Sequence, residues 1–298
     1  AMLARTHGQP AIPTTFGKEM AVFASRLLRQ LQRLDRITLT GKFNGAVGGY
    51  QAMVFAKPDV NWPEFSKDFI ESLNLEPNEL TTQSNPADDL TELFSVLHLS
   101  NTILLDLSQD TWRYISDNWL IQKNKTQYVG SSTMPHKVNP IEFENAEGNL
   151  QLANSLFELF NRKLPVSRLQ RDLSDSTVLR NIGSSFAYSL IAYQSLCDGL
   201  KKIEPNREQL TKTLEANYGI LSEAWQTLAR THGDKKAYEL VAQKSKQAHF
   251  SREKWQAGTK SVDHRLAELT PQTYIGLTPQ LARQASKKIQ TYLAHNPS

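Results

Sequence analysis

The sequence has almost no cysteine and no long hydrophobic run, and each lack excludes a class of protein. Cys197 is the single cysteine among 298 residues, so no disulfide can form within the chain. One unpaired cysteine fits a reducing cytoplasm. It lies in an apolar stretch, where we expect it to be buried. No run of roughly eighteen apolar residues occurs, so no membrane span is expected.

Metal-ligand spacing and strand-like alternation are also missing. Cysteine, histidine and carboxylate residues form no cluster with the spacing of a metal site, so no metal is expected. We expect no other cofactor. Apolar and polar residues do not alternate over any convincing run, and no internal repeat or low-complexity segment is present. The lack of strand-like alternation favours a helical protein.

The charge balance is mildly basic, with a net charge of +4. Basic proteins favour anionic partners. Lysines and arginines are scattered through the chain rather than gathered in a stripe with aromatic residues, which disfavours nucleic acid. A small polyanionic substrate accounts for the balance equally well.

Apolar residues at three- and four-residue spacing predict long helices over 15–39, 88–121, 141–159 and 176–203. A helix over 88–121 would span about 50 Å at about 1.5 Å per residue, which indicates an elongated bundle. Pro205 and Asn206 mark a domain boundary, beyond which glycine and proline separate short helices. The sequence therefore predicts an all-α fold, with a long-helix bundle over 1–203 and a smaller helical domain over 204–298.

A glycine-rich stretch, GKFNGAVGGY, follows the first predicted helix. This stretch could be interpreted as a phosphate-binding loop, but it lacks the Lys-Ser/Thr ending of such loops and does not follow a strand. A turn that permits close packing, or close approach to a ligand, is the favoured interpretation.

Small, polar and turn-forming residues fill the loop 129–140, whose core reads GSSTMPHKVNP. Two adjacent hydroxyls, a lysine and a histidine could fold over an anion there. The helix predicted to begin near Ile141 would present free backbone N–H groups close by. Alone, such a loop is weak evidence, since many are connectors.

Together with neighbouring motifs, this loop resembles the signature of the fumarase/aspartase superfamily. Its enzymes release fumarate or a related acid by β-elimination. The octapeptide ARTHGQPA at 4–11 is similar to SRTHGQPA of the family and departs from it only at Ala4. His136 in the loop, and NPIEFENAEGN and KLPVSRLQRDLSDSTVLRN after it, make the chain similar to the long bacterial form of the adenylosuccinate lyase family. The carboxymuconate-cycloisomerase-like enzymes are neighbours.

The resemblance implies β-elimination of fumarate from adenylosuccinate, which yields AMP, and from the succinylated aminoimidazole carboxamide ribotide of purine biosynthesis. That reaction needs a base, an acid and stabilisation of a carboxylate that gains charge. Ser131 is implied as the base and His7 as the acid, and a histidine titrates near neutrality. How Ser131 is activated stays open, and His136 is either a second acid or a residue that orients the loop.

The same resemblance implies two groups of substrate-binding residues. Those expected near the succinyl carboxylates are Thr6, Gln83, Ser132, Lys137, Asn139 and Asn145. Those expected at the nucleotide phosphate are Arg171, Ser176 and Arg180, which offer two guanidinium forks and a hydroxyl. Without the motif, both arginines would more often be solvated or paired with Asp172 or Asp175.

Family members begin with an N-terminal domain, and none of it precedes Thr6 here. They build each active site from three subunits of a tetramer. We therefore expect a homotetramer with shared active sites, and little activity from this chain alone. Adenylosuccinate, AMP and fumarate are the expected small-molecule partners, with no nucleic acid and no membrane.

Two alternatives stay open. Another lyase of the superfamily would act on argininosuccinate or a cyclic lactone acid, although the set of Arg171, Ser176 and Arg180 favours a phosphorylated substrate. A non-catalytic helical assembly or nucleic-acid-binding module would use the basic charge instead.

Overall fold

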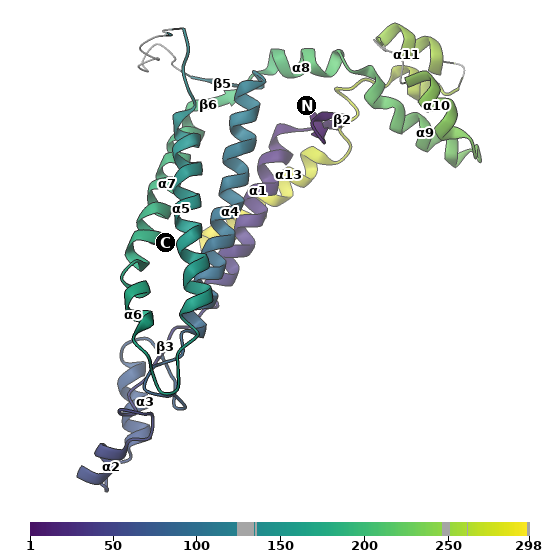
Figure 1. Cartoon of the computed structure of the whole chain (residues 1–298). Coiled ribbons are helices and arrows are strands. Elements are labelled where there is room, and N and C mark those ends of the chain that lie inside the picture. The colour runs from purple at the N-terminus through teal and green to yellow at the C-terminus, as the bar shows by residue number, and fades with distance from the viewer. Residues whose placement is uncertain (124–133, 135, 246–250, 261, 297–298) are drawn as a thin grey trace. The chain divides into compact units, whose positions relative to one another are not determined.

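The computed structural model describes residues 1–123, 134, 136–245, 251–260 and 262–296 (Figure 1). The chain forms two compact units that alternate along the sequence. The first unit contains residues 1–25, 113–138 and 202–298, and the second contains residues 26–112 and 139–201. The boundary predicted near residue 203 remains a prediction.

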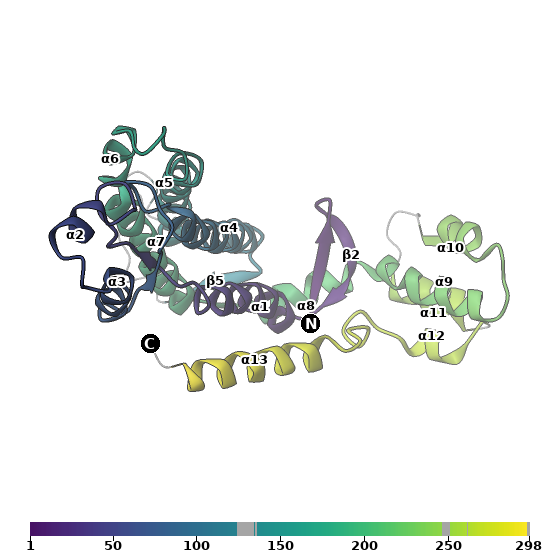
Figure 2. The ribbon, with the colours of Figure 1, turned by 90° about the horizontal axis from the view of Figure 1, so that it is seen from below.

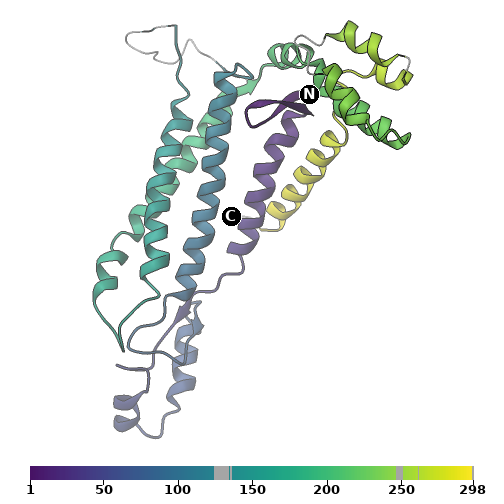
Figure 3. The same ribbon diagram turned by 45° about the vertical axis from the view of Figure 1, so that its right-hand side comes forward.

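Long helices make up most of the second unit, as Figures 1 and 3 show. They belong to α4 (Asp88–Ser116), α5 (Ile141–Lys163) and α7 (Ile182–Lys202), while α1 (Phe16–Leu34) begins in the first unit. Their buried aromatic side chains form the core. The Phe94 ring of α4 lies 5.7 Å from Phe157 and 5.1 Å from Phe160 of α5, measured between centroids. Aromatic contacts of this kind add to the stabilisation that burial provides.

Shorter elements follow α1 in the second unit. Strand β3 (Thr40–Gly41) pairs in parallel with β4 (Glu76–Pro77), and between them lie α2 (Gln51–Ala56) and α3 (Trp62–Glu71). A Cβ at Gly41 would come within 3.0 Å of Ile70 and 3.2 Å of Leu75. The glycine-rich stretch therefore permits close packing, as the favoured interpretation of the sequence predicted.

The first unit begins with a hairpin of β1 (Met2–Thr6) and β2 (Gln9–Thr14), and β5 (Leu120–Gln122) pairs with β6 (Ile203–Pro205). Its α-helices, labelled in Figure 2, are α8 (Arg207–Glu215), α9 (Ser222–Thr231), α10 (Ala237–Ser245), α11 (Arg252–Thr259), α12 (His264–Glu268) and α13 (Thr278–His295). A short 3₁₀ helix, η2 (Tyr218–Leu221), lies between α8 and α9. Trp225 and Trp255 meet edge to face at 5.9 Å in its core. Met2, Leu3 and Trp119 belong to the same core, so the hairpin is anchored in it.

The helical fold class is confirmed, with corrections to its details. Among the described residues, six strands of two to six residues were not predicted: four of them have only two or three residues, and β2 contains Pro10 and Pro13. Helices α1 and α4 end before residues 39 and 121, and Asn118, with φ of 59°, lies in the turn after α4. The helix predicted over 176–203 is divided into α6 (Ser174–Leu179) and α7.

Cys197 is exposed, which contradicts the expected burial. The buried residues of α7 recur at three- and four-residue spacing, at Ser185, Ser189, Ala192, Leu196 and Gly199. Cys197 lies outside that stripe, so an apolar stretch of sequence was not enough to bury it. Among the described residues, no helix has both the length and the apolar character needed to cross a membrane. No three histidine, cysteine or carboxylate side chains gather around a possible metal position there either.

Candidate active site

Thr6 and His7 lie at the tip of the β1–β2 hairpin. Thr6 pairs with Gln9, so His7 and Gly8 form a two-residue turn with φ of 52° and 72°. Two consecutive positive φ angles are the signature of the type I′ turn that suits the twist of a hairpin. The Arg5 guanidinium donates to the Gly8 carbonyl at 3.0 Å. Both Thr6 and His7 are exposed, so the hairpin presents the imidazole outward.

Ser131 and Ser132 lie outside the described residues, so their predicted roles gain no geometry here. The described end of the same loop carries His136 and Lys137, which are both exposed. The Gln122 side chain, on β5, donates to the Val138 carbonyl at 2.9 Å and fixes the loop where it returns. The sequence does not predict a role for Gln122, because a single glutamine in a short strand carries no motif.

Asn139 and Asn145 stand at the start of α5, in the second unit. Asn139 is half-buried and precedes the first helical turn, while Asn145 is exposed and begins the next turn. The Asn149 amide donates to the Asn145 carbonyl oxygen at 2.9 Å and to its side-chain oxygen at 3.3 Å. The exposed helix start therefore offers amide groups to a ligand, close to backbone N–H groups that lack helical partners.

Gln83 is exposed on a loop whose backbone is held from a distant part of the chain. The Lys42 ammonium donates to the carbonyls of Thr82 at 3.0 Å and Gln83 at 2.9 Å. The Asn44 amide donates to the Thr81 hydroxyl oxygen at 2.9 Å. The side chain of Gln83 thus projects from a fixed backbone.

Arg171, Ser176 and Arg180 lie on and around α6, at the segment that follows α5. Both arginines are exposed, and Ser176 is half-buried with its hydroxyl donating to the Leu173 carbonyl at 3.1 Å. Among the described residues, neither arginine forms an ion pair with Asp172 or Asp175. Arg180 is the C-terminal cap of α6. The guanidinium groups are therefore not engaged by these two carboxylates.

Asp172 closes this segment on itself. Its carboxylate accepts from the Arg168 N–H at 2.9 Å, from the Ser174 N–H at 2.8 Å and from the Ser174 hydroxyl. These bonds, those from Ser174 first, hold the pKa of Asp172 well below its ordinary value. These hydrogen bonds occupy the Asp172 carboxylate, which explains why it forms no ion pair with Arg171 or Arg180.

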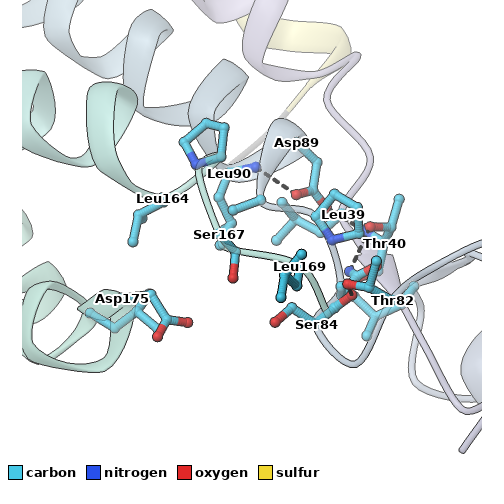
Figure 4. A pocket seen from close by; sticks show the side chains of 16 residues that line it. Leu39, Thr40, Thr82, Ser84, Asp89, Leu90, Leu164, Ser167, Leu169 and Asp175 are labelled. Carbon is cyan, nitrogen blue, oxygen red and sulfur yellow. Dashed lines mark hydrogen bonds between the residues drawn. The ribbon is translucent and has the colours of Figure 1, made fainter. Parts of the chain in front are cut away.

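A cavity of about 430 Å³ in the second unit lies between the loop of Gln83 and the segment before α6 (Figure 4). Thr82 and Ser84, on either side of Gln83, line it together with Ser167 and Asp175. One carboxylate oxygen of Asp175 is buried without a hydrogen-bond partner. The structure thus places residues next to Gln83 and a residue next to Ser176 around one cavity. The distance between Gln83 and Ser176 in the sequence does not indicate this.

Asn145 and the arginine segment lie far apart within the second unit. At one end of the α4–α5 pair the Trp112 indole donates to Glu144 at 3.1 Å, and at the other end the Phe94 ring lies 5.1 Å from the Phe160 ring, between centroids. Phe94 and Trp112 are roughly 27 Å apart along α4, at about 1.5 Å per residue. Asn145 neighbours Glu144, whereas the segment of Arg171 follows the end of α5 beyond Phe160. One copy of the unit cannot bring both to one small ligand.

Two family models match the chain: one described as "Lyase" over residues 1–153, and one described as "Adenylosuccinate lyase C-terminal" over residues 167–275. Adenylosuccinate lyase of Legionella pneumophila (strain Corby) is 48% identical over 292 residues, which is 96% of this chain and 64% of the relative. The enzyme of the same name from Escherichia coli (strain K12) is 47% identical over 281 residues, with 92% and 62% covered. The chain thus spans less than two thirds of the length of these relatives.

Among solved structures, 3-carboxy-cis,cis-muconate lactonizing enzyme from Pseudomonas putida matches with a TM-score of 0.78 at 21% identity, covering 98% of this chain and 67% of that one. Fumarate lyase from Mesorhizobium sp. BNC1 matches with a TM-score of 0.75 at 20% identity, covering 95% and 66%. At these identities the likeness concerns the fold.

Proposed function

The chain belongs to the lyase family whose model covers residues 1–153, and from this premise we propose that it acts as the core of an adenylosuccinate lyase. The reaction is β-elimination of fumarate from adenylosuccinate to give AMP, together with the parallel cleavage of the succinylated aminoimidazole carboxamide ribotide. The observation that carries the proposal is the identity of 44–48% to enzymes of that name. The adenylosuccinate lyase C-terminal model also spans Arg171, Ser176 and Arg180.

His7 is the proposed acid that protonates the leaving nitrogen. The hairpin fixes the backbone of His7 in a tight turn and leaves its imidazole exposed, so the ring can meet a substrate held elsewhere. A positioned acid of this kind is worth about 10²–10⁴-fold in rate. The assignment of Ser131 as the base depends on the resemblance of the loop sequence, and Lys137 supplies positive charge six residues later.

Carboxylate and phosphate binding are the proposed roles of the remaining polar residues. Thr6, Gln83, Ser132, Lys137, Asn139 and Asn145 would hold the succinyl carboxylates. Arg171 and Arg180 would bind the phosphate, since both are exposed and, within the described part of the chain, neither forms an ion pair with Asp172 or Asp175. Ser176 would add its hydroxyl. Two-pronged guanidinium contacts suit phosphate oxygens.

A homotetramer with active sites shared between subunits is the proposed assembly. The separation of Asn145 from the arginine segment supports it, because residues proposed to bind one substrate cannot meet within one copy of the second unit. Apolar side chains on α7 also support it: Phe186, Leu190 and Ile191 are 40%, 68% and 49% exposed. Burying such a face is what obligate interfaces do.

The accompanying proposals concern organisation and setting. The bundle over 1–203 with its catalytic loop 129–140, and the helical domain over 204–298, are the proposed domains. No cofactor, nucleic acid or membrane enters the proposed reaction, and the single cysteine supports a cytoplasmic setting.

The direct test follows the ultraviolet change on cleavage of adenylosuccinate, with argininosuccinate as the competing substrate. Because the chain spans less than two thirds of its relatives, the assay uses the chain and a chimera in which it replaces the matched segment of the Escherichia coli relative. Cleavage by the chimera that is lost in its His7→Ala variant supports the proposal. Cleavage of argininosuccinate alone would replace it with the alternative lyase.

A further inference from the structure

Lys42 lies in the glycine-rich stretch after α1, and its ammonium donates only to backbone oxygens in the bonds that the structure shows. The three acceptors are the carbonyls of Gly45 at 3.2 Å, Thr82 at 3.0 Å and Gln83 at 2.9 Å. An ammonium has three N–H donors, so these contacts use its full capacity. Two of the acceptors belong to the loop that presents Gln83, about forty residues further along the chain.

The environment of Lys42 is unusual for a lysine. Its side chain is partly buried, and burial lowers its pKa. Within the described part of the chain, no ion pair includes Lys42. The Lys42 ammonium donates to backbone carbonyls rather than to a carboxylate, so it ties three points of the backbone to one group. Such contacts hold the geometry of the backbone.

Two neighbours of Lys42 hold the same loop. Asn44 is 1% exposed, and its amide donates to the Glu79 carbonyl at 3.2 Å and to the Thr81 hydroxyl oxygen at 2.9 Å. Gly48 has φ of 76°, and a Cβ there would overlap the Thr81 carbonyl. We call Lys42, Asn44 and Gly48 the clamp. It contacts the loop at Glu79, Thr81, Thr82 and Gln83.

We propose that Lys42 is a positioning residue, which acts through the clamp to fix the backbone from which Gln83 reaches the succinyl carboxylate. The proposal rests on the proposed lyase function. Its physical content is preorganisation: a side chain that must meet a carboxylate loses less entropy on binding when its backbone is already fixed. The ammonium never touches the substrate in this role.

The first test measures hydrogen exchange of residues 78–85 in the 298-residue chain. In Lys42→Met the segment is expected to exchange at least about tenfold faster, because a loop without its charged donor opens more often and exposes N–H groups such as that of Asn78, which donates to the Gly41 carbonyl at 2.8 Å. Lys42→Arg should restore protection in large part. Lys67→Met is the matched control, since the Lys67 side chain lies on α3 of the same unit and is 54% exposed. If Lys42→Met does not fold, Lys42→Gln replaces it with the same expected direction. Unchanged exchange, or an equal change in Lys67→Met, would overturn the proposal.

The second test separates positioning from general stability by kinetics of the chimera. Lys42→Met is expected to lower kcat/KM about tenfold, yet to add almost nothing in a Gln83→Ala background, because the two residues act as one unit. Additive losses in the double variant would overturn the positioning role. A chimera that cleaves no adenylosuccinate would refute the proposed function alone, since hydrogen exchange still decides whether Lys42 holds the loop.

Discussion

The two candidate binding segments of the second unit are built in opposite ways. The loop of Gln83 is held by residues about forty positions earlier, through Lys42 and Asn44. The segment of Arg171 is closed by its own neighbours, since Asp172 accepts from Arg168 and Ser174. One is therefore fixed by tertiary structure, and the other by a local hydrogen-bonded turn.

This difference matches the proposed tasks of the two segments. A residue beside the bond that breaks must be placed accurately, because small errors in position there reduce the rate strongly. A phosphate is remote from that bond, and long exposed guanidinium side chains can adjust to it. The comparison predicts that changes at the first segment reduce turnover, whereas changes at the second mainly weaken binding.

The largest expected effect tests the arginine segment. Arg171→Met or Arg180→Met in the chimera is expected to raise KM for adenylosuccinate about 10–150-fold, which corresponds to the roughly 1.5–3 kcal/mol of a charge-assisted contact. The rate at saturation should change much less. Steady-state kinetics with each variant measure both quantities. A fall in kcat with unchanged KM would assign the arginines to the chemical step instead.

Gly48→Ala disturbs the loop of Gln83 through the close approach of Gly48 to Thr81. The new Cβ would overlap the Thr81 carbonyl at a φ that favours glycine, so we expect a loss of about 1–3 kcal/mol in unfolding free energy. Gly148→Ala is the matched control, because a Cβ at Gly148 in α5 would meet no other atom within 4 Å. That variant should gain about 0.5–1 kcal/mol from helix propensity. Denaturant unfolding of both variants measures the difference, and equal effects would contradict the close approach at Gly48.

Asp172→Ala opens the local turn and should have the smallest effect. We expect faster hydrogen exchange confined to residues 167–176 and a smaller rise in KM than either arginine variant shows. The same turn should weaken in acid. Because its hydrogen bonds hold the folded-state pKa of Asp172 below the ordinary 3.8, its contribution is complete above that value and is lost as the pH falls below it. Exchange measured at two pH values on either side would detect this, and spread of the change to residues 78–85 would contradict the separation of the two segments.

The sequence predicted the helical fold and the polar residues of the motifs, because periodicity and short motifs are local signals. It could not predict that Lys42 holds the loop of Gln83, since that contact depends on how the chain reverses after α1. The hairpin under His7 escaped because its strands are short and contain Pro10 and Pro13. The break at Arg180 escaped because the apolar pattern continues from Val178 to Ile182 without a glycine or proline.

The exposure of Cys197 shows the same limit. An apolar neighbourhood in sequence indicates a helix, but the face of the helix that is buried depends on its partners. The separation of Asn145 from Arg171 is also a property of helix length and pairing rather than of any motif. These tertiary features carry the argument for shared active sites.

Subunit complementation tests that argument most directly. Asn145→Asp and Arg171→Glu each place a carboxylate against the anionic substrate, so homomeric chimeras of either variant should be nearly inactive. If active sites draw these residues from different chains, mixed assemblies of the two variants contain some sites with neither change, and about a quarter of the wild-type activity should return for random mixing. Mixed assemblies that remain as inactive as both parents would show that one chain supplies both residues, and would contradict the account.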